Sequence, residues 1–159
     1  MADEASLHQN RGTIFQDMAL VELAMNSLIS LEYLGKIDRR FISEFLQEPR
    51  FSFELRKKIF RQVYERRYSG QTFPWKSLQA IQEKRNILAH ARLDKTIISM
   101  EGKVVKEMPP HYQYHTQTVD AENLHSEFKD DFHKVAVACN AIAKDTHVTF
   151  SDKAGKLVS

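Results

Sequence analysis

The sequence predicts a mainly α-helical protein, an antiparallel bundle of four to five helices with a small β-hairpin inserted before the last long helix. Apolar residues recur at three- and four-residue spacing through several long segments, as amphipathic helices require. Five glycines and four prolines in 159 residues are few, which favours long helices over many tight turns. Short β-rich runs begin only after Asp94. The length fits a single domain over residues 1–159 with one buried core.

The first helix is expected over residues 13–34, where apolar residues follow the helical spacing. The polar, acidic residues 1–12 lack that pattern and are expected to be disordered. Gly35 should end the first helix. Asp38 can cap a short second helix over residues 39–47.

A third helix should follow, capped by Ser52 and running to about Tyr68. Its apolar face is expected to hold Leu55, Ile59 and Val63, with Phe60 and Tyr64 beside them. Its polar surface is expected to carry six cations against two carboxylates: Arg56, Lys57, Lys58, Arg61, Arg66 and Arg67 against Glu54 and Glu65. Such a charged face is usually only solvated. The alternative is that it contacts the phosphates of a nucleic acid, chiefly through Arg56, Lys57 and Arg61.

The β insertion is expected over residues 96–119. It should begin with a hairpin around a glycine turn, and residues 111–115 can add a third short strand. Asp120 is a plausible cap for the last long helix, whose apolar stripe runs through Leu124, Phe128, Phe132, Val135, Cys139 and Ile142. The tail, residues 146–159, alternates weakly and is expected to be a small strand or frayed.

The composition indicates an ordinary soluble protein, with 42% hydrophobic and 28% charged residues. A net charge of +2 permits a nucleic-acid partner without demanding one. The single cysteine, Cys139, excludes an internal disulfide framework, suits a reducing compartment and is expected to be a small buried hydrophobe. The N-terminus has no apolar signal segment, and charged and polar residues interrupt residues 18–34, so we expect a cytoplasmic protein with no membrane span.

Several chemistries are disfavoured. His111 and His115 lie four apart but in a β-rich context, without a carboxylate or cysteine cluster, so no metal site is expected. The sequence has no glycine-rich phosphate loop and no Gly-x-Ser-x-Gly or His-Glu-x-x-His motif, and no cofactor is expected. Tyr112 and Tyr114 can stack on bases, although packing on the bundle is the more ordinary role for tyrosines on a strand.

The sharpest functional signal is Arg85, with Asn86 and His90. No Gly or Pro interrupts residues 75–94, so we place this stretch on one helix. At about 100° per residue, its apolar side chains form a stripe roughly 140° wide, with Arg85 in the middle. An unpaired buried arginine costs several kcal/mol. Asn86 and His90 lie together on the flank of the stripe.

These residues can cleave RNA without a metal. A histidine can take a proton from a ribose 2′-hydroxyl, which attacks the adjacent phosphate, and an arginine can stabilise the charge that develops. Arg85 and His90, five positions apart, point roughly 140° away from each other, and a second copy of the helix facing this one can bring one Arg beside the other His, so the geometry favours a composite site at a dimer interface. The alternative is structural: Arg85 pairs with a buried carboxylate and His90 is a polar helix residue.

The segment from Arg85 to His90 resembles the Arg-Asn-x-x-x-His signature of the HEPN superfamily, small helical-bundle proteins of bacterial toxin–antitoxin and antiphage systems. The resemblance covers roughly residues 13–94 and, more loosely, 120–145. It implies a metal-independent endoribonuclease with its active site at a homodimer interface, Arg85 and His90 as the catalytic pair, Asn86 orienting the site, and an antitoxin as a possible partner. Members paired with nucleotidyltransferase antitoxins carry a tyrosine two residues after the histidine. Arg92 stands there instead, which argues against regulation through that tyrosine and makes Arg92 a candidate second phosphate contact.

Two other interpretations remain open at this point. One is a non-catalytic HEPN-like module that binds RNA or a partner protein at the same surface. The other is a plain helical dimerisation domain in which Arg85 is a structural ion-pair partner.

Overall fold

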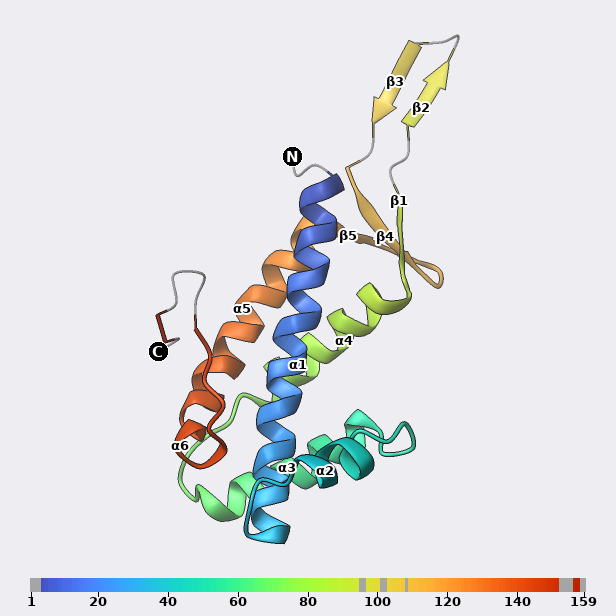
Figure 1. Cartoon of the computed structure of the whole chain (residues 1–159). Coiled ribbons are helices and arrows are strands. Elements are labelled where there is room, and N and C mark those ends of the chain that lie inside the picture. Colours follow the sequence, from blue (N-terminus) through green and yellow to red (C-terminus); the bar gives the residue numbers. More distant parts are fainter. Residues whose placement is uncertain (1–3, 95–96, 101–102, 108, 152–155, 158–159) are drawn as a thin grey trace. The chain divides into compact units, whose positions relative to one another are not determined.

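The computed structural model describes residues 4–94, 97–100, 103–107, 109–151 and 156–157, and it confirms the mainly α-helical fold (Figure 1). The elements in chain order are α1 Glu4–Leu34, α2 Arg39–Phe41, the π-helical η1 Ile42–Leu46, α3 Phe53–Arg67, α4 Trp75–His90, β1 Arg92–Asp94, β2 Ile97–Met100, β3 Lys103–Glu107, β4 His111–Tyr114, β5 Gln117–Asp120, α5 Ala121–Asn140 and α6 Ala143–Thr146. The described chain falls into two compact units. Unit 1 contains residues 1–18 and 76–132, and unit 2 contains residues 19–75 and 133–159.

The first helix is longer than predicted. It starts at Glu4, and Leu7 within it is only 1% exposed, so the expectation of disorder over residues 1–12 is wrong for residues 4–12. Burial of Leu7 supplies the stabilisation that the polar composition of this stretch does not suggest. At the other end the prediction is confirmed, since Gly35 has φ +67° and its N–H donates to the Leu31 carbonyl at 3.0 Å.

Three of the predicted helix caps are confirmed. The Asp38 carboxylate accepts from the N–H groups of Arg40 and Phe41 at 3.0 Å each, and Ser52 Oγ accepts from Leu55 N–H at 3.2 Å. Asp120 Oδ1 likewise accepts from Asn123 N–H at 2.7 Å at the start of α5. The segment after Asp38 is not one α-helix, however, because α2 passes directly into the π-helical turn η1.

The buried face of α3 differs from the predicted one. It is formed by Arg56, Phe60, Val63 and Tyr64, whereas Leu55 is 41% exposed. Phe60 and Tyr64 belong to an aromatic cluster of unit 2 in which neighbouring ring centroids are 4.5 to 5.9 Å apart. The other two members of the cluster are Phe73 and Trp75. Burying these rings stabilises the fold more than burying Leu55 would, so α3 buries the face that carries Phe60 and Tyr64.

The helix α4 ends at His90 instead of continuing to Asp94. Arg92 therefore lies on β1, which pairs with β4, and the prediction of one helix over residues 75–94 is wrong for residues 91–94. Strand β4 was expected, but β1 and β5 were not; together they form an antiparallel sheet in the order β1–β4–β5. The predicted hairpin is confirmed as β2 paired with β3, while its Glu101-Gly102 turn lies outside the described residues.

The apolar stripe of α5 is buried as predicted, with Leu124, Phe128, Val135 and Cys139 all at most 2% exposed. Burial raises the pKa of the Cys139 thiol to about 12, which fits a small buried hydrophobe. In the tail, Phe150 is 1% exposed and its N–H donates to the Asn140 side chain at 2.9 Å. The tail's strand character is limited to an isolated bridge between Ser151 and Leu157.

One helical stretch among the described residues, Ala5–Leu34, is long and apolar enough to cross a membrane. In the most apolar 18-residue part of this helix, 56% is buried within the protein, as in the core helix of a soluble protein. Burial and composition together are compatible with a soluble protein.

Candidate functional site

Arg85 lies on the core-facing stripe of α4, as predicted. Leu78, Ile81 and Leu88 on this stripe are fully buried, while Arg85 itself is partly exposed. Its guanidinium carbon lies 5.7 Å from the centroid of the Phe15 ring on α1, within unit 1. A cation over an aromatic face is attracted by the ring's negative π-cloud, so Phe15 helps to hold the guanidinium in place.

Asn86 is the other group that holds Arg85. The Arg85 Nη1 donates to Asn86 Oδ1 at 3.3 Å. Among the residues that the structure describes, no carboxylate forms an ion pair with Arg85. The neighbouring cation behaves differently, since the Lys84 ammonium lies 3.1 Å from Asp131 and 3.4 Å from Glu127. Arg85 therefore has no ion-pair partner within the described residues, which weighs against the structural alternative of a buried ion pair.

His90 and Arg92 lie apart from this pair. His90 is the exposed last residue of α4, five positions after Arg85 and hence about 140° around the helix. Within the described part of unit 1, no contact joins the two side chains. Arg92 is exposed on β1, opposite Gln113. One protomer thus brings Arg85 and Asn86 together and does not bring His90 to them.

The expectation that Arg56 faces solvent is wrong. Arg56 is only 9% exposed. Its Nη1 donates to Oε2 of Glu22 on α1 at 2.9 Å, within unit 2. The guanidinium also lies 5.7 Å from the centroid of the Phe53 ring. Arg56 is a structural residue here, because its charge is already neutralised and little of its surface is open to a phosphate.

The other two candidate phosphate ligands on α3 are engaged locally. The Lys57 side chain is 18% exposed and its ammonium lies 2.7 Å from Glu54. Arg61 pairs with Glu65 at 2.8 Å and also lies over the Trp75 ring, 5.3 Å from its centroid. Both pairs are close in sequence, and the Arg61–Glu65 pair is more than half exposed, so it contributes little and can exchange for another anion.

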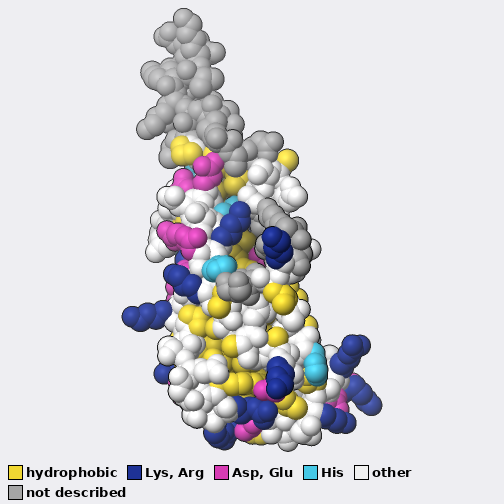
Figure 2. Space-filling view, turned by 90° about the vertical axis from the view of Figure 1, so that its left-hand side faces the viewer, with side chains coloured by type: hydrophobic (Ala, Val, Ile, Leu, Met, Phe, Trp, Pro, Cys, Tyr) yellow, Lys and Arg dark blue, Asp and Glu magenta, His cyan; other side chains and the backbone are white. Residues whose placement is uncertain are grey.

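Positive charge is nevertheless concentrated in unit 2, which carries 14 Lys and Arg residues against 9 Asp and Glu. Unit 1 carries 9 against 12. Lys58 on α3 is exposed and has no ion-pair partner among the described residues. On the face drawn in Figure 2, Lys and Arg side chains lie among exposed hydrophobic ones. The whole-chain charge of +2 hides this asymmetry.

A buried polar pair in unit 1 was not predicted. The Tyr112 hydroxyl lies 3.1 Å from His125 Nε2, and the two residues are 1% and 4% exposed. Tyr112 thus packs inside the protein, which is the more ordinary of the two roles considered for it from the sequence. Burial, and then the nearby Lys129 charge, lowers the pKa of His125. The helical spacing of Ala121, His125 and Phe128 was the signal that could have placed this histidine in the core.

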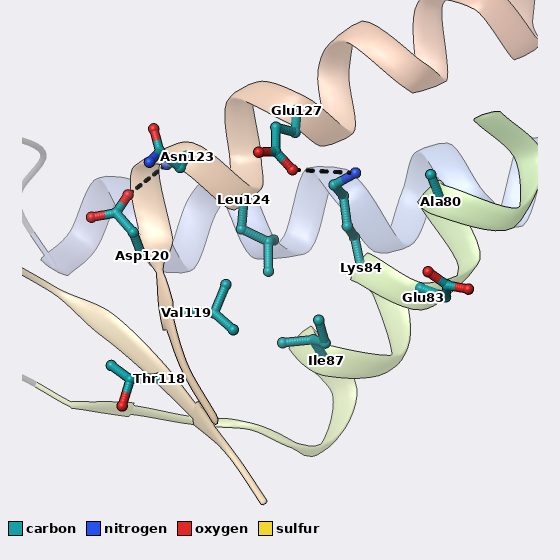
Figure 3. Close-up of a pocket in the computed structure, with 10 residues that line it drawn as sticks. All are labelled: Ala80, Glu83, Lys84, Ile87, Thr118, Val119, Asp120, Asn123, Leu124 and Glu127. Carbon is teal, nitrogen blue, oxygen red and sulfur yellow. Dashed lines mark hydrogen bonds and ion pairs between the residues drawn. The ribbon is translucent and has the colours of Figure 1, made fainter. Parts of the chain in front are cut away.

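Unit 1 also contains an open pocket of about 420 Å³ between α4, β5 and the start of α5 (Figure 3). Lys84 reaches across it toward Glu127, and Asp120 turns instead to the backbone of Asn123 (Figure 3). Among the described residues, no group of three His, Cys, Asp or Glu side chains is placed to hold a metal ion. Glu83, Lys84, Thr118 and Asp120 in its lining already have hydrogen-bond or ion-pair partners, so the pocket offers few free polar groups to a ligand.

No family model, curated protein or solved structure matches this chain.

Proposed function

We propose that the protein is a cytoplasmic, metal-independent endoribonuclease of the HEPN type, acting as a toxin or in antiphage defence, with a composite Arg/His site at a homodimer interface. The observation that carries the proposal is the state of Arg85. Its guanidinium is half-buried, held by Phe15 and Asn86, and has no carboxylate partner among the described residues. A cation held in this way is suited to a phosphate.

In the proposed reaction Arg85 binds the scissile phosphate and stabilises the negative charge that develops on it. His90 of the partner copy takes the proton of the ribose 2′-hydroxyl as the 2′-oxygen attacks phosphorus. The bond from phosphorus to the 5′-oxygen breaks, and that oxygen receives the proton from the imidazolium. The products are a 2′,3′-cyclic phosphate and a 5′-hydroxyl. Asn86 would act as a positioning residue, because its Oδ1 accepts from the guanidinium.

The helix geometry supports the proposed dimer. Arg85 and His90 occupy one α-helix at positions about 140° apart, so one copy of α4 does not aim both at the same phosphate. Two antiparallel copies of α4 would place Arg85 of each opposite His90 of the other. Two equivalent sites follow from the twofold symmetry of such a dimer.

The first test is cleavage of single-stranded RNA by the purified protein in excess chelator. Wild type should cleave, and Arg85→Ala and His90→Ala should each lose activity. Undiminished cleavage by either variant would refute the assignment.

The second test mixes the two inactive variants after joint refolding or co-expression. A heterodimer of Arg85→Ala with His90→Ala retains one intact composite site. Random pairing should therefore restore about a quarter of the wild-type activity. If a mixture shown to contain heterodimers stays inactive, Arg85 and His90 do not act together across a dimer interface, and the composite site is contradicted.

The basic excess of unit 2 favours a second candidate, a non-catalytic module that binds RNA. It predicts binding without cleavage, with an affinity that falls as salt rises. Exposed Lys58 and Arg61 are its expected phosphate contacts. Binding by a protein that leaves RNA intact in every condition would select this function over the first.

A further inference from the structure

Unit 2 contains an apolar groove of about 380 Å³ that the ribonuclease proposal does not use. It is lined by residues of α1, α2, η1, α3 and the loop between η1 and α3: Ile29, Tyr33, Leu34, Phe41, Phe45, Leu46, Phe51 and Ile59. No polar atom contributes to its exposed wall. The volume lies within the range of about 300–1,000 Å³ that is typical of ligand sites.

The groove is built around a row of three phenylalanines. The Phe41 and Phe45 rings stack with centroids 5.2 Å apart, and Phe45 and Phe51 are also 5.2 Å apart. Phe45 is nevertheless 53% exposed, and Tyr33, which also lines the groove, is 56% exposed. The π-helical turn η1 carries Phe45, and such turns are frequent at functional sites. Exposed aromatic rings gathered in one hollow, rather than scattered singly, mark an interaction site.

The rim of the groove, meaning the charged residues next to its lining residues in the sequence, holds more cations than carboxylates. Phe41, Phe51 and Ile59 directly follow the exposed cations Arg40, Arg50 and Lys58. Tyr33 and Phe45 follow Glu32 and Glu44, and Glu32 is itself paired with Arg66 and Arg67. Arg40 and Arg50 pair with glutamates at 3.3 and 3.6 Å, but these pairs are largely exposed and contribute little. Together with the basic excess of unit 2, this rim favours an occupant that is apolar on one side and acidic at its edges.

We propose that this groove is the docking site for an acidic amphipathic helix of a partner protein. Apolar side chains at helical spacing would enter the groove, and carboxylates on the helix flanks would meet Arg40, Arg50 and Lys58. This mode uses both features of the surface, the wall without polar atoms and the positive rim.

Two other occupants fit less well. Nucleobases would bring polar edges against a wall that offers no donor or acceptor, and unsatisfied polar groups are costly to bury. A second copy docking the same face across a twofold axis would bring two positive rims together.

The test measures binding of fluorescein-labelled 20-residue peptides to the full-length protein by anisotropy. The probe is a helical peptide with leucine and phenylalanine on one face and glutamate on its flanks. A matched peptide carries lysine in place of glutamate. The acidic peptide should bind about tenfold tighter or more, and its affinity should fall with salt.

Three variants locate the site. Phe45→Glu should weaken binding of the acidic peptide at least tenfold, since Phe45 is the exposed centre of the groove. Lys58→Glu should weaken it by several-fold and flatten the salt dependence. Leu23→Glu is the matched control, because Leu23 is 40% exposed on α1 but does not line the groove, and it should bind as wild type does.

Four results would overturn the proposal. They are equal affinity for the acidic and basic peptides, insensitivity to Phe45→Glu, loss of the dimer in Phe45→Glu by light scattering, and RNA binding that Phe45→Glu abolishes. The third would assign the groove to a second copy and the fourth to nucleic acid. Because Arg85 and His90 do not line the groove, RNA cleavage by Phe45→Glu reports on the ribonuclease proposal separately.

Discussion

Replacing Arg56 by alanine should destabilise the protein without removing a phosphate contact. The guanidinium donates to Glu22 at 2.9 Å, and the two side chains are only 11% and 24% exposed. Truncating Arg56 would leave the Glu22 carboxylate partly buried without its counter-charge. It would also remove the packing of the arginine stem and the contact with the Phe53 ring.

The size of the effect follows from the burial of the pair. Removing one partner of a buried ion pair costs about 3–5 kcal/mol. Because Glu22 retains some exposure, water can partly rehydrate its carboxylate, and we place the cost near the lower end, at about 3 kcal/mol. In a protein of this size that loss lowers Tm by about 6–12 °C. The exposed Lys58, two residues along the same helix, provides the control, and Lys58→Ala should change stability by no more than about 0.5 kcal/mol.

Thermal and urea unfolding of Arg56→Ala and Lys58→Ala measure this directly. A cycle of Arg56→Met, Glu22→Met and the double variant removes the charges singly and together. The double variant should recover much of the loss, with a coupling energy above about 1 kcal/mol. The reasoning is wrong if Arg56→Ala unfolds like wild type and yet binds RNA more weakly. That result would mean that Arg56 serves a ligand rather than Glu22.

Three further predictions follow from buried or strained groups. The folded-state pKa of His125 lies below its ordinary value of 6.5, so the unfolded state binds the proton first, and stability should fall as pH drops below about 6.5. His125→Gln should flatten this slope in urea titrations at pH 5 to 7.5, whereas exposed His133→Gln should not. The Cys139 thiol, with a pKa of about 12 and no exposure, should react with a disulfide reagent only after unfolding; labelling at the rate of free cysteine would contradict its burial. Gly35→Ala should cost about 1 kcal/mol in urea unfolding, since φ is +67° while the space around it is open; no loss would mean that the turn relaxes.

The features that the sequence predicted well are local ones. The caps Asp38, Ser52 and Asp120 each act on a backbone N–H two or three residues away, so a short window contains all the partners. Gly35 likewise ends α1 through its own backbone conformation. The hairpin pairs β2 with β3, which are neighbours in the chain.

The features that it missed depend on distant partners. Which face of α3 is buried is decided by Glu22, 34 positions before Arg56 in the chain, and by the aromatic cluster of unit 2. Arg92 joins a strand because Gln113, far along the chain, pairs with it. Helical periodicity alone continues through residues 91–94 and gives no sign of either partner.

The candidate site shows the same division. That Arg85 lies on the core-facing stripe of α4 follows from spacing alone and is confirmed by the burial of Leu78, Ile81 and Leu88. Whether it has a carboxylate partner is a tertiary question, because any carboxylate would come from another helix. The sequence therefore left the catalytic and the structural alternatives open.

The two adjacent cations of α4 have different partners, and this difference supports the catalytic proposal. Lys84 and Arg85 differ by one position, and α5 supplies two carboxylates, Glu127 and Asp131, both of which pair with Lys84. The longer guanidinium of Arg85, which is always charged, lies instead over Phe15 beside a neutral amide. If Arg85 served only to stabilise the bundle, one carboxylate facing it would neutralise its charge, which the Phe15 ring and the Asn86 amide do not. The ion pairs of α4 therefore stabilise the fold through Lys84, and among the described residues Arg85 has no carboxylate partner, as the proposed phosphate contact requires.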